Sequence, residues 1–121
     1  MTLPNGASFV AEIPHRLLIF TDNFASNPDN VQGMCGQSET GETYLHVVSL
    51  GPTPRETLSA LIDSCLTGVH NVEQPVFDSS SRKLQFDLTG GVDLPYTFIY
   101  RIASDNSVTL IEPAGWHGFP P

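Results

Sequence analysis

The sequence predicts a single α+β domain, in which one amphipathic helix packs on one face of a largely antiparallel sheet. Three observations support this class. The segment 53–68, TPRETLSALIDSCLTG, carries helix signals at both ends and an apolar stripe between them. Most other apolar segments are short and bounded by Gly, Pro, Asn, Asp or Ser, which is typical of strands. Short turns join successive strands, which favours antiparallel pairing.

The main helix is predicted at about 54–67. Thr53 can cap its first turn, and Glu56 can reach back to the Thr53 N–H. Pro54 falls at the first helical position, where its missing N–H costs no hydrogen bond. Gly68 suits the left-handed residue that ends many helices. Between these ends, the apolar residues follow the i, i+3, i+4 spacing of one helix face: Leu58, Leu61, Ile62, Cys65, Leu66 and Val69.

The sequence predicts about five to seven strands around this helix. The candidates are 8–13, 16–21, 43–50, 76–77, 83–88, 96–103 and 107–111. A turn around Pro14 joins the first two into a hairpin, and Ser104–Asn106 joins the last two. The polar segment 22–41 is predicted to be a long loop, with a short strand near 31–35 as an alternative. Loops of this length often carry binding sites.

Composition fits one domain, 1–121, that ends in an irregular Pro- and Gly-rich tail, 112–121. The chain has 13 acidic and 5 basic residues and a net charge of -8. A surface so negative repels phosphate backbones and anionic lipid, so neither nucleic acid nor membrane is a predicted partner. It favours a protein partner, and a basic one in particular. The alternative is that the acidity serves only solubility.

The cellular location is predicted to be cytoplasmic. Residues 1–15 lack the basic start and apolar run of a signal peptide. No segment has the roughly 20 apolar residues that span a bilayer. In the cytoplasm we expect both cysteines to be reduced: Cys35, in a Gly-rich segment, and Cys65, on the predicted helix stripe.

Catalytic motifs are absent from the sequence, which lacks G-x-S-x-G, a P-loop, G-x-G-x-x-G and H-E-x-x-H. His70 and Glu73 have a spacing that suits metal ligands on a helix, but Gly68 and Pro75 place them in a predicted loop. Two solvated side chains are the favoured interpretation. No metal site and no cofactor are predicted.

His46 lies in the middle of the predicted strand 43–50, on the same face as Tyr44. We expect a neighbouring hydroxyl or carbonyl to satisfy its ring. The alternative is a small enzyme or ligand-binding domain with a pocket between helix and sheet. His46 would then be the acid/base, and Tyr44 or Arg101 would orient the substrate. Arg101 can also pair with an acid on an adjacent strand.

The C-terminal tail holds the single tryptophan, Trp116, together with His117 and Phe119. Such side chains either pin a tail onto its own domain or anchor a partner, where aromatic residues dominate binding energy. We therefore assign Trp116, His117 and Phe119 as candidate partner-binding residues, alongside the 22–41 loop.

The N-terminal half also carries short motifs that resemble a known group of proteins. They run from Asn5-Gly6-Ala7 through Glu12-Ile13-Pro14 to Phe20–Phe24, and then to Pro28-Asp29-Asn30 and Gln32. In these motifs the chain is similar to the Mog1/PsbP-like fold group, and to the Ran-binding Mog1 proteins within it. The sequence departs from that pattern at Gly33-Met34-Cys35-Gly36, and its C-terminal half is shorter.

This resemblance implies a non-enzymatic protein-binding domain with a strand followed by a single amphipathic helix. It also implies Asp29 as a contact, with Asn30 beside it. The leading hypothesis from the sequence is a small acidic binding protein, such as an adaptor, inhibitor or immunity-type partner, that acts by surface contact. The enzyme with His46 is its rival, and a third reading is a structural subunit with an unpaired edge strand.

Overall fold

The computed structural model describes residues 7–24, 41–90 and 96–116. Within these ranges the protein contains nine strands and no helix, so the predicted α+β class is wrong and the fold is all-β. The strands are β1 (Ala7–Ile13), β2 (Leu17–Phe24), β3 (Glu42–Ser49), β4 (Arg55–Ser64), β5 (His70–Asn71), β6 (Val76–Asp78), β7 (Lys83–Thr89), β8 (Tyr96–Ile102) and β9 (Val108–Glu112). The same residues contain no helix that is long and apolar enough to cross a membrane.

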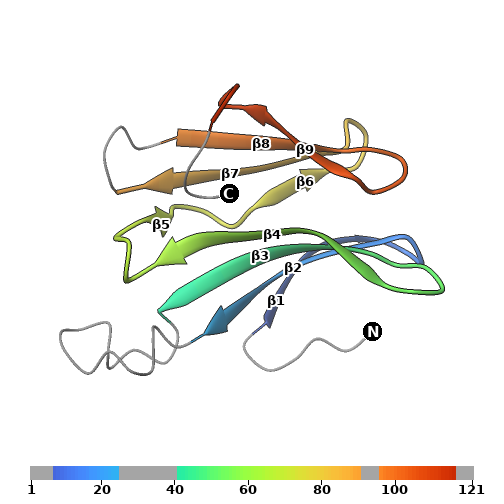
Figure 1. Cartoon of the computed structure of the whole chain (residues 1–121), viewed down its shortest axis with the longest axis horizontal. Coiled ribbons are helices and arrows are strands. Elements are labelled where there is room, and N and C mark those ends of the chain that lie inside the picture. Colours follow the sequence, from blue (N-terminus) through green and yellow to red (C-terminus); the bar gives the residue numbers. More distant parts are fainter. Residues whose placement is uncertain (1–6, 25–40, 91–95, 117–121) are drawn as a thin grey trace.

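The strands form two antiparallel sheets, which lie as two layers (Figure 1). The first sheet has the order β1-β2-β3-β4. The second has the order β5-β7-β8-β9, and β6 also pairs with β7. Strands that follow one another in the chain are neighbours in almost every case, so each sheet is a meander. The antiparallel pairing predicted from the short turns is confirmed.

One hydrophobic core fills the space between the two sheets. It consists of inward-facing residues that alternate along the strands, as expected for strands that bury one face. The buried members are Leu17, Ile19, Leu45, Val47, Ala60, Ile62, Val69, Leu84, Phe86, Leu88, Phe98, Tyr100 and Ile102. The inward alternation of Leu84, Phe86 and Leu88 confirms the pattern predicted for 83–88.

The segment predicted as the main helix, 54–67, is instead mostly β4. This strand pairs with β3 from Glu42↔Ser64 to Ser49↔Arg55, with two register shifts. Its inward side carries Ala60 and Ile62, which are buried in the core, and beyond a register shift Ser64 is buried beside Glu42. Because Ala60 and Ser64 are small, the period of two is weak in the sequence, and the larger leucines gave a helical spacing instead.

The helix-end signals of that segment serve turns. Thr53 and Pro54 lie in the connection between β3 and β4, just before the strand begins. Gly68 adopts a φ of 74° in the turn after β4, where its N–H donates to the Ser64 carbonyl at 3.0 Å. Turns and helix ends favour the same residue types. The residues that predicted the ends of a helix therefore form the turns on either side of a strand.

The other predicted strands coincide with β1, β2, β3, β6, β7, β8 and β9 to within a few residues. The hairpins around Pro14 and Ser104–Asn106 are also confirmed. The short strand β5 lies in a segment predicted to be a connector. Most of the predicted 22–41 loop, including 31–35, lies outside the described residues, as does the tail beyond Trp116.

A buried asparagine in the turn between β8 and β9 ties the two sheets together at one end. Asn106 is 7% exposed and has a left-handed φ of 69°. Its Nδ2 donates to the Arg16 carbonyl at 2.8 Å and to Ser49 Oγ at 3.1 Å, both in the first sheet or its turns. Its Oδ1 accepts from Arg82 Nη2 at 3.0 Å. These bonds fix how the two sheets sit against each other.

We expect Asn106→Gly to lower the free energy of unfolding by about 1–3 kcal/mol, because glycine accepts the positive φ but leaves the buried partners unsatisfied. Urea denaturation measures this difference. The matched control is His15→Gly, since His15 is exposed and has a φ of 65°. We expect it to change stability by less than about 0.5 kcal/mol. Equal losses in the two variants would show that the Asn106 bonds contribute nothing.

The expectation that both cysteines are reduced is wrong for Cys65, which is disulfide-bonded. The other cysteine of the sequence, Cys35, lies outside the described residues. Cys65 follows β4 directly, and its backbone N–H donates to Glu42 Oε2 at 2.8 Å. The disulfide-bonded residue and the Glu42 bond therefore both lie where the chain leaves the first sheet.

We expect the unfolded but unreduced protein to contain no thiol that iodoacetamide can alkylate. We also expect Cys65→Ala to lower the free energy of unfolding by about 2–4 kcal/mol, because the open chain gains conformational entropy when it unfolds. Mass spectrometry and denaturant titration measure the two effects. Full alkylation of the unreduced chain would contradict the disulfide.

Candidate functional site

A hollow of about 650 Å³ lies on the outer face of the first sheet, near the ends of β2 and β4. The even-numbered residues of β2 and β3 face this side, because the odd-numbered ones face the core. The side chains around the hollow are mostly apolar or aromatic, with a few hydroxyls and one carboxylate. They belong to Phe24, Glu42, Tyr44, His46, Ser59, Leu61, Ser64, Leu66 and Thr67.

A row of rings crosses β2 and β3 beside the hollow. Phe20 stacks on His46 with ring centroids 4.9 Å apart and an interplanar angle of 26°. Tyr44 lies on the other side of His46, at 6.2 Å and 22°. Phe24 meets Tyr44 nearly at a right angle, at 5.8 Å and 83°. The row is built because cross-strand neighbours on one face bring their side chains together.

His46 is held between two carboxylates that come from the neighbouring strands. Its Nε2 lies 2.6 Å from Asp22 Oδ1 on β2, and its Nδ1 lies 3.2 Å from Glu56 Oε2 on β4. The His46 and Asp22 side chains are 12% and 16% exposed, whereas Glu56 is 46% exposed. Each ring nitrogen therefore has a carboxylate oxygen of a neighbouring strand within hydrogen-bond distance, and the tautomer decides which nitrogen donates.

We expect the His46–Asp22 pair to be coupled more strongly than the His46–Glu56 pair. The first contact is shorter and better buried, and hydrogen bonds to buried charged groups are worth about 1.5–3 kcal/mol. The second is open to water, and such pairs give less than about 1 kcal/mol. Two double-mutant cycles, with alanine at each position, measure both couplings. Equal coupling energies would contradict the assignment.

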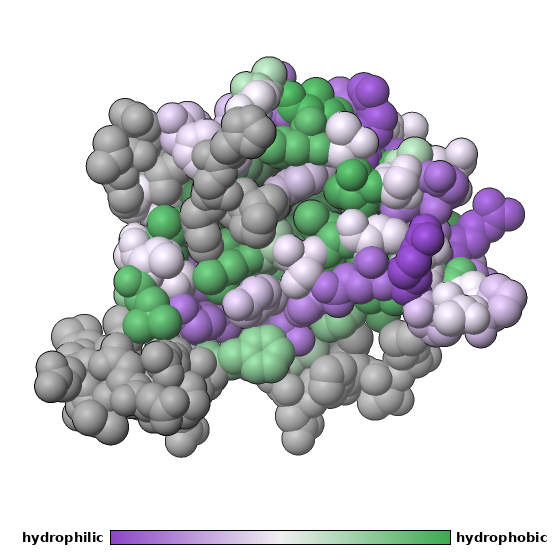
Figure 2. Space-filling model, in the orientation of Figure 1, coloured by the Kyte–Doolittle hydropathy of each residue, from purple (hydrophilic) through white to green (hydrophobic). Residues whose placement is uncertain are grey.

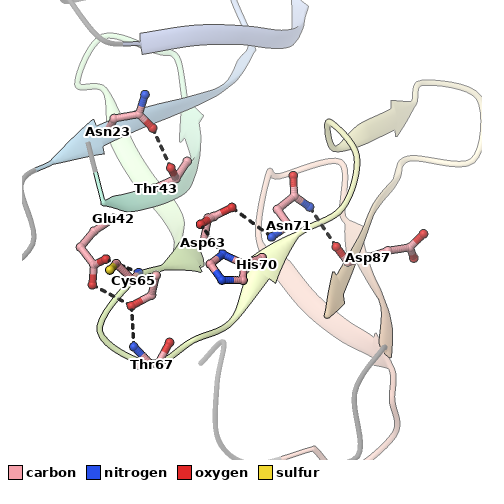
Figure 3. Close-up of polar contacts among 10 residues, drawn as sticks. Asn23, Glu42, Thr43, Asp63, Cys65, Thr67, His70, Asn71 and Asp87 are labelled. Carbon is pink, nitrogen blue, oxygen red and sulfur yellow. Dashed lines mark hydrogen bonds and ion pairs between the residues drawn. The ribbon is translucent and has the colours of Figure 1, made fainter. Parts of the chain in front are cut away.

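A second polar cluster forms the rim of the hollow at the turn after β4 (Figure 3). The carboxylate of Glu42 is 7% exposed and accepts from Ser64 Oγ at 2.7 Å and from the Cys65 N–H at 2.8 Å. Ser64 Oγ accepts in turn from the Thr67 N–H at 3.1 Å. These bonds fix a negative charge at the wall of the hollow.

The structure places the predicted site residues in several parts of the molecule. Tyr44 and His46 lie together at the hollow. Arg101 lies on β8 with its side chain on the outer face of the second sheet, so of the two orienting residues in the enzyme hypothesis only Tyr44 lies beside His46. Trp116 packs on Tyr96 at 5.1 Å and on Phe98 at 5.8 Å, against the core of its own domain. The remaining candidates lie outside the described residues: Asp29, Asn30, His117 and Phe119.

Several residues of the site were missed in the sequence. Phe20, Asp22 and Phe24 alternate in the string FTDNF, but the predicted strand ended at 21. A predicted strand that continued to residue 24 would have placed all three side chains on the face of the sheet that carries His46. Leu61 belongs to the apolar stripe of the predicted helix, so the sequence did not predict that it pairs with Tyr44 on β3.

His70 and Glu73 do not belong to a metal site among the residues that the structure describes. Nowhere in those ranges do three or more His, Cys, Asp or Glu side chains gather as metal ligands. His70 Nδ1 instead lies 3.1 Å from Asp63 Oδ1, and the Asn71 N–H donates to Asp63 Oδ2 at 3.2 Å (Figure 3). Asp63 thus joins β4 to β5.

No protein family, curated protein or solved structure matched the chain. The resemblance to the Mog1/PsbP-like fold group therefore stays a prediction. Strand β4 occupies most of the segment where that resemblance implies a helix.

Proposed function

We propose that this protein is a non-catalytic binding domain that holds a protein partner against the outer face of its first sheet. The observation that carries the proposal is the hollow, whose lining among the described residues includes Phe24, Tyr44 and Leu61. Aromatic side chains at such a surface supply most of the energy in protein recognition. A net charge of -8 favours a basic partner.

The enzyme hypothesis receives less support from the same geometry. A general base needs a ring nitrogen that can take a proton from the substrate. Both nitrogens of His46 already contact carboxylates, and Arg101 lies on the opposite sheet. The hollow also lies on an outer sheet face rather than between a helix and a sheet.

A small molecule bound in the hollow is the second candidate function. The volume of about 650 Å³ falls within the range of pockets that bind small molecules. Such a ligand would be held by the same rings, without catalysis.

We also propose that the domain acts in an oxidising compartment, instead of the cytoplasm predicted from the sequence. The support is the disulfide at Cys65, because disulfides are rare in proteins kept in reducing surroundings.

We expect Tyr44→Ala to weaken capture of a partner by at least about tenfold, since it removes a central aromatic anchor. Affinity capture from the source cells by the immobilised domain, followed by quantitative mass spectrometry, measures this. The control is Gln85→Ala on the exposed outer face of the second sheet. A specific partner retained equally by the wild type and Tyr44→Ala would refute the proposed surface.

A further inference from the structure

We propose that the hollow receives an arginine side chain of a basic protein partner. This inference rests on the proposed function and adds the chemical identity of the group that is bound. Three features of the structure support it: the angle between two rings, the distribution of charge along the molecule, and the hydrogen bonds that the Glu42 carboxylate already accepts in the wall.

The two rings at the hollow form a corner that suits a flat cation. Phe24 and Tyr44 meet edge to face at 83°, and both rings line the hollow, so the hollow is bordered by rings that lie in two different directions. A guanidinium is planar and stacks on aromatic faces, and arginine is the cation most often found over rings. Leu61 and Leu66 provide further apolar wall, against which the methylene stem of an arginine can pack.

The basic residues of the chain all lie at the opposite end of the molecule. They occupy the β1–β2, β3–β4 and β6–β7 turns and the strand ends beside them, on the right in Figure 1. In Figure 2 the most strongly hydrophilic groups of the visible face also gather toward that end. The complete set of 5 is Arg16, Arg55, Arg82, Lys83 and Arg101.

The hollow therefore opens at the end that contains no lysine or arginine. Glu42 lies in its wall, and Asp22 lies on the adjacent strand β2. Even with a protonated His46 ring, the cluster of His46, Asp22 and Glu56 holds two negative charges against one positive charge. The local field thus attracts a cation and repels an anion.

Arginine fits this site better than lysine because of hydration. The wall is largely apolar, and its Glu42 carboxylate already accepts bonds from Ser64 and Cys65. An ammonium is compact and strongly hydrated, so it loses more when it leaves water. A guanidinium spreads its charge over a plane and is more weakly hydrated, which lets it exchange water for ring contacts at a lower cost.

The test uses three tripeptide amides, acetyl-Gly-Xaa-Gly, in which Xaa is arginine, lysine or citrulline. Citrulline is the neutral isostere of arginine, so the comparison isolates the charge. Two-dimensional NMR titration of the full chain gives the affinity of each and the residues that shift. We expect arginine to shift the resonances of the hollow, citrulline to bind about tenfold more weakly, and lysine to bind several-fold more weakly.

Variants at Phe24 connect the binding to the rings without touching the core, because Phe24 is 51% exposed. We expect Phe24→Leu to weaken arginine binding by about tenfold and Phe24→Tyr to retain it, whereas Gln85→Ala should leave it unchanged. Circular dichroism confirms that each variant is folded.

Equal binding of arginine and citrulline would overturn the inference, as would tighter binding of lysine or shifts that lie away from the hollow. Absence of binding by all three peptides would also overturn it. The proposed function fails separately, through partner capture that ignores Tyr44→Ala. Capture that depends on Tyr44 without any preference for arginine would leave the binding surface in place and remove arginine as its ligand.

Discussion

The alternation of side chains along β3 is the constraint on which the rest of this structure depends. Leu45 and Val47 must face the core, and both are completely buried. Tyr44 and His46 must then face outward, because successive residues of a strand point to opposite sides. A slip of one residue would bury the His46 ring and expose Leu45, so the burial of the core fixes the position of the hollow. The same strand thus lines the core with one face and the hollow with the other.

His46 adds a second constraint on the same face. Its two nitrogens contact Asp22 on β2 and Glu56 on β4, so one ring connects three neighbouring strands. The ring also lies between those of Phe20 and Tyr44. An imidazole that lies between aromatic rings, with a carboxylate within hydrogen-bond distance of each nitrogen, is well satisfied where it lies. This arrangement explains how an ionisable side chain can occupy the middle of a sheet and lie against Tyr44.

The sequence predicted the strands well because most of them carry clear local signals. Leu84, Phe86 and Leu88 alternate with polar residues, and the Ser104–Asn106 turn follows from side chains that bond their own backbone. Strand β4 was mistaken for a helix because Ala60 and Ser64 are small, and because Thr53 and Gly68 suit turns and helix ends equally. Only its pairing with β3 decides between the two, and pairing is not a local property. The candidate site could be predicted only in part for the same reason. Alternation along one strand places Tyr44 and His46 on the same face, but Asp22 and Glu56 come from other strands and join the site only through strand pairing.

The order of the strands has a consequence for how the chain folds. Residues 7–64 supply the whole first sheet, and residues 70–112 supply the whole second sheet. Among the described strands, every pairing joins consecutive strands except that of β5 with β7. Only the connection between β2 and β3 is long, so the entropy lost in closing most of the loops is small. Such a meander has a lower contact order than a sandwich built from interleaved strands, and a lower contact order is associated with faster folding. Each meander can form by local hairpin growth, and the joining of the two layers is left as the main long-range event.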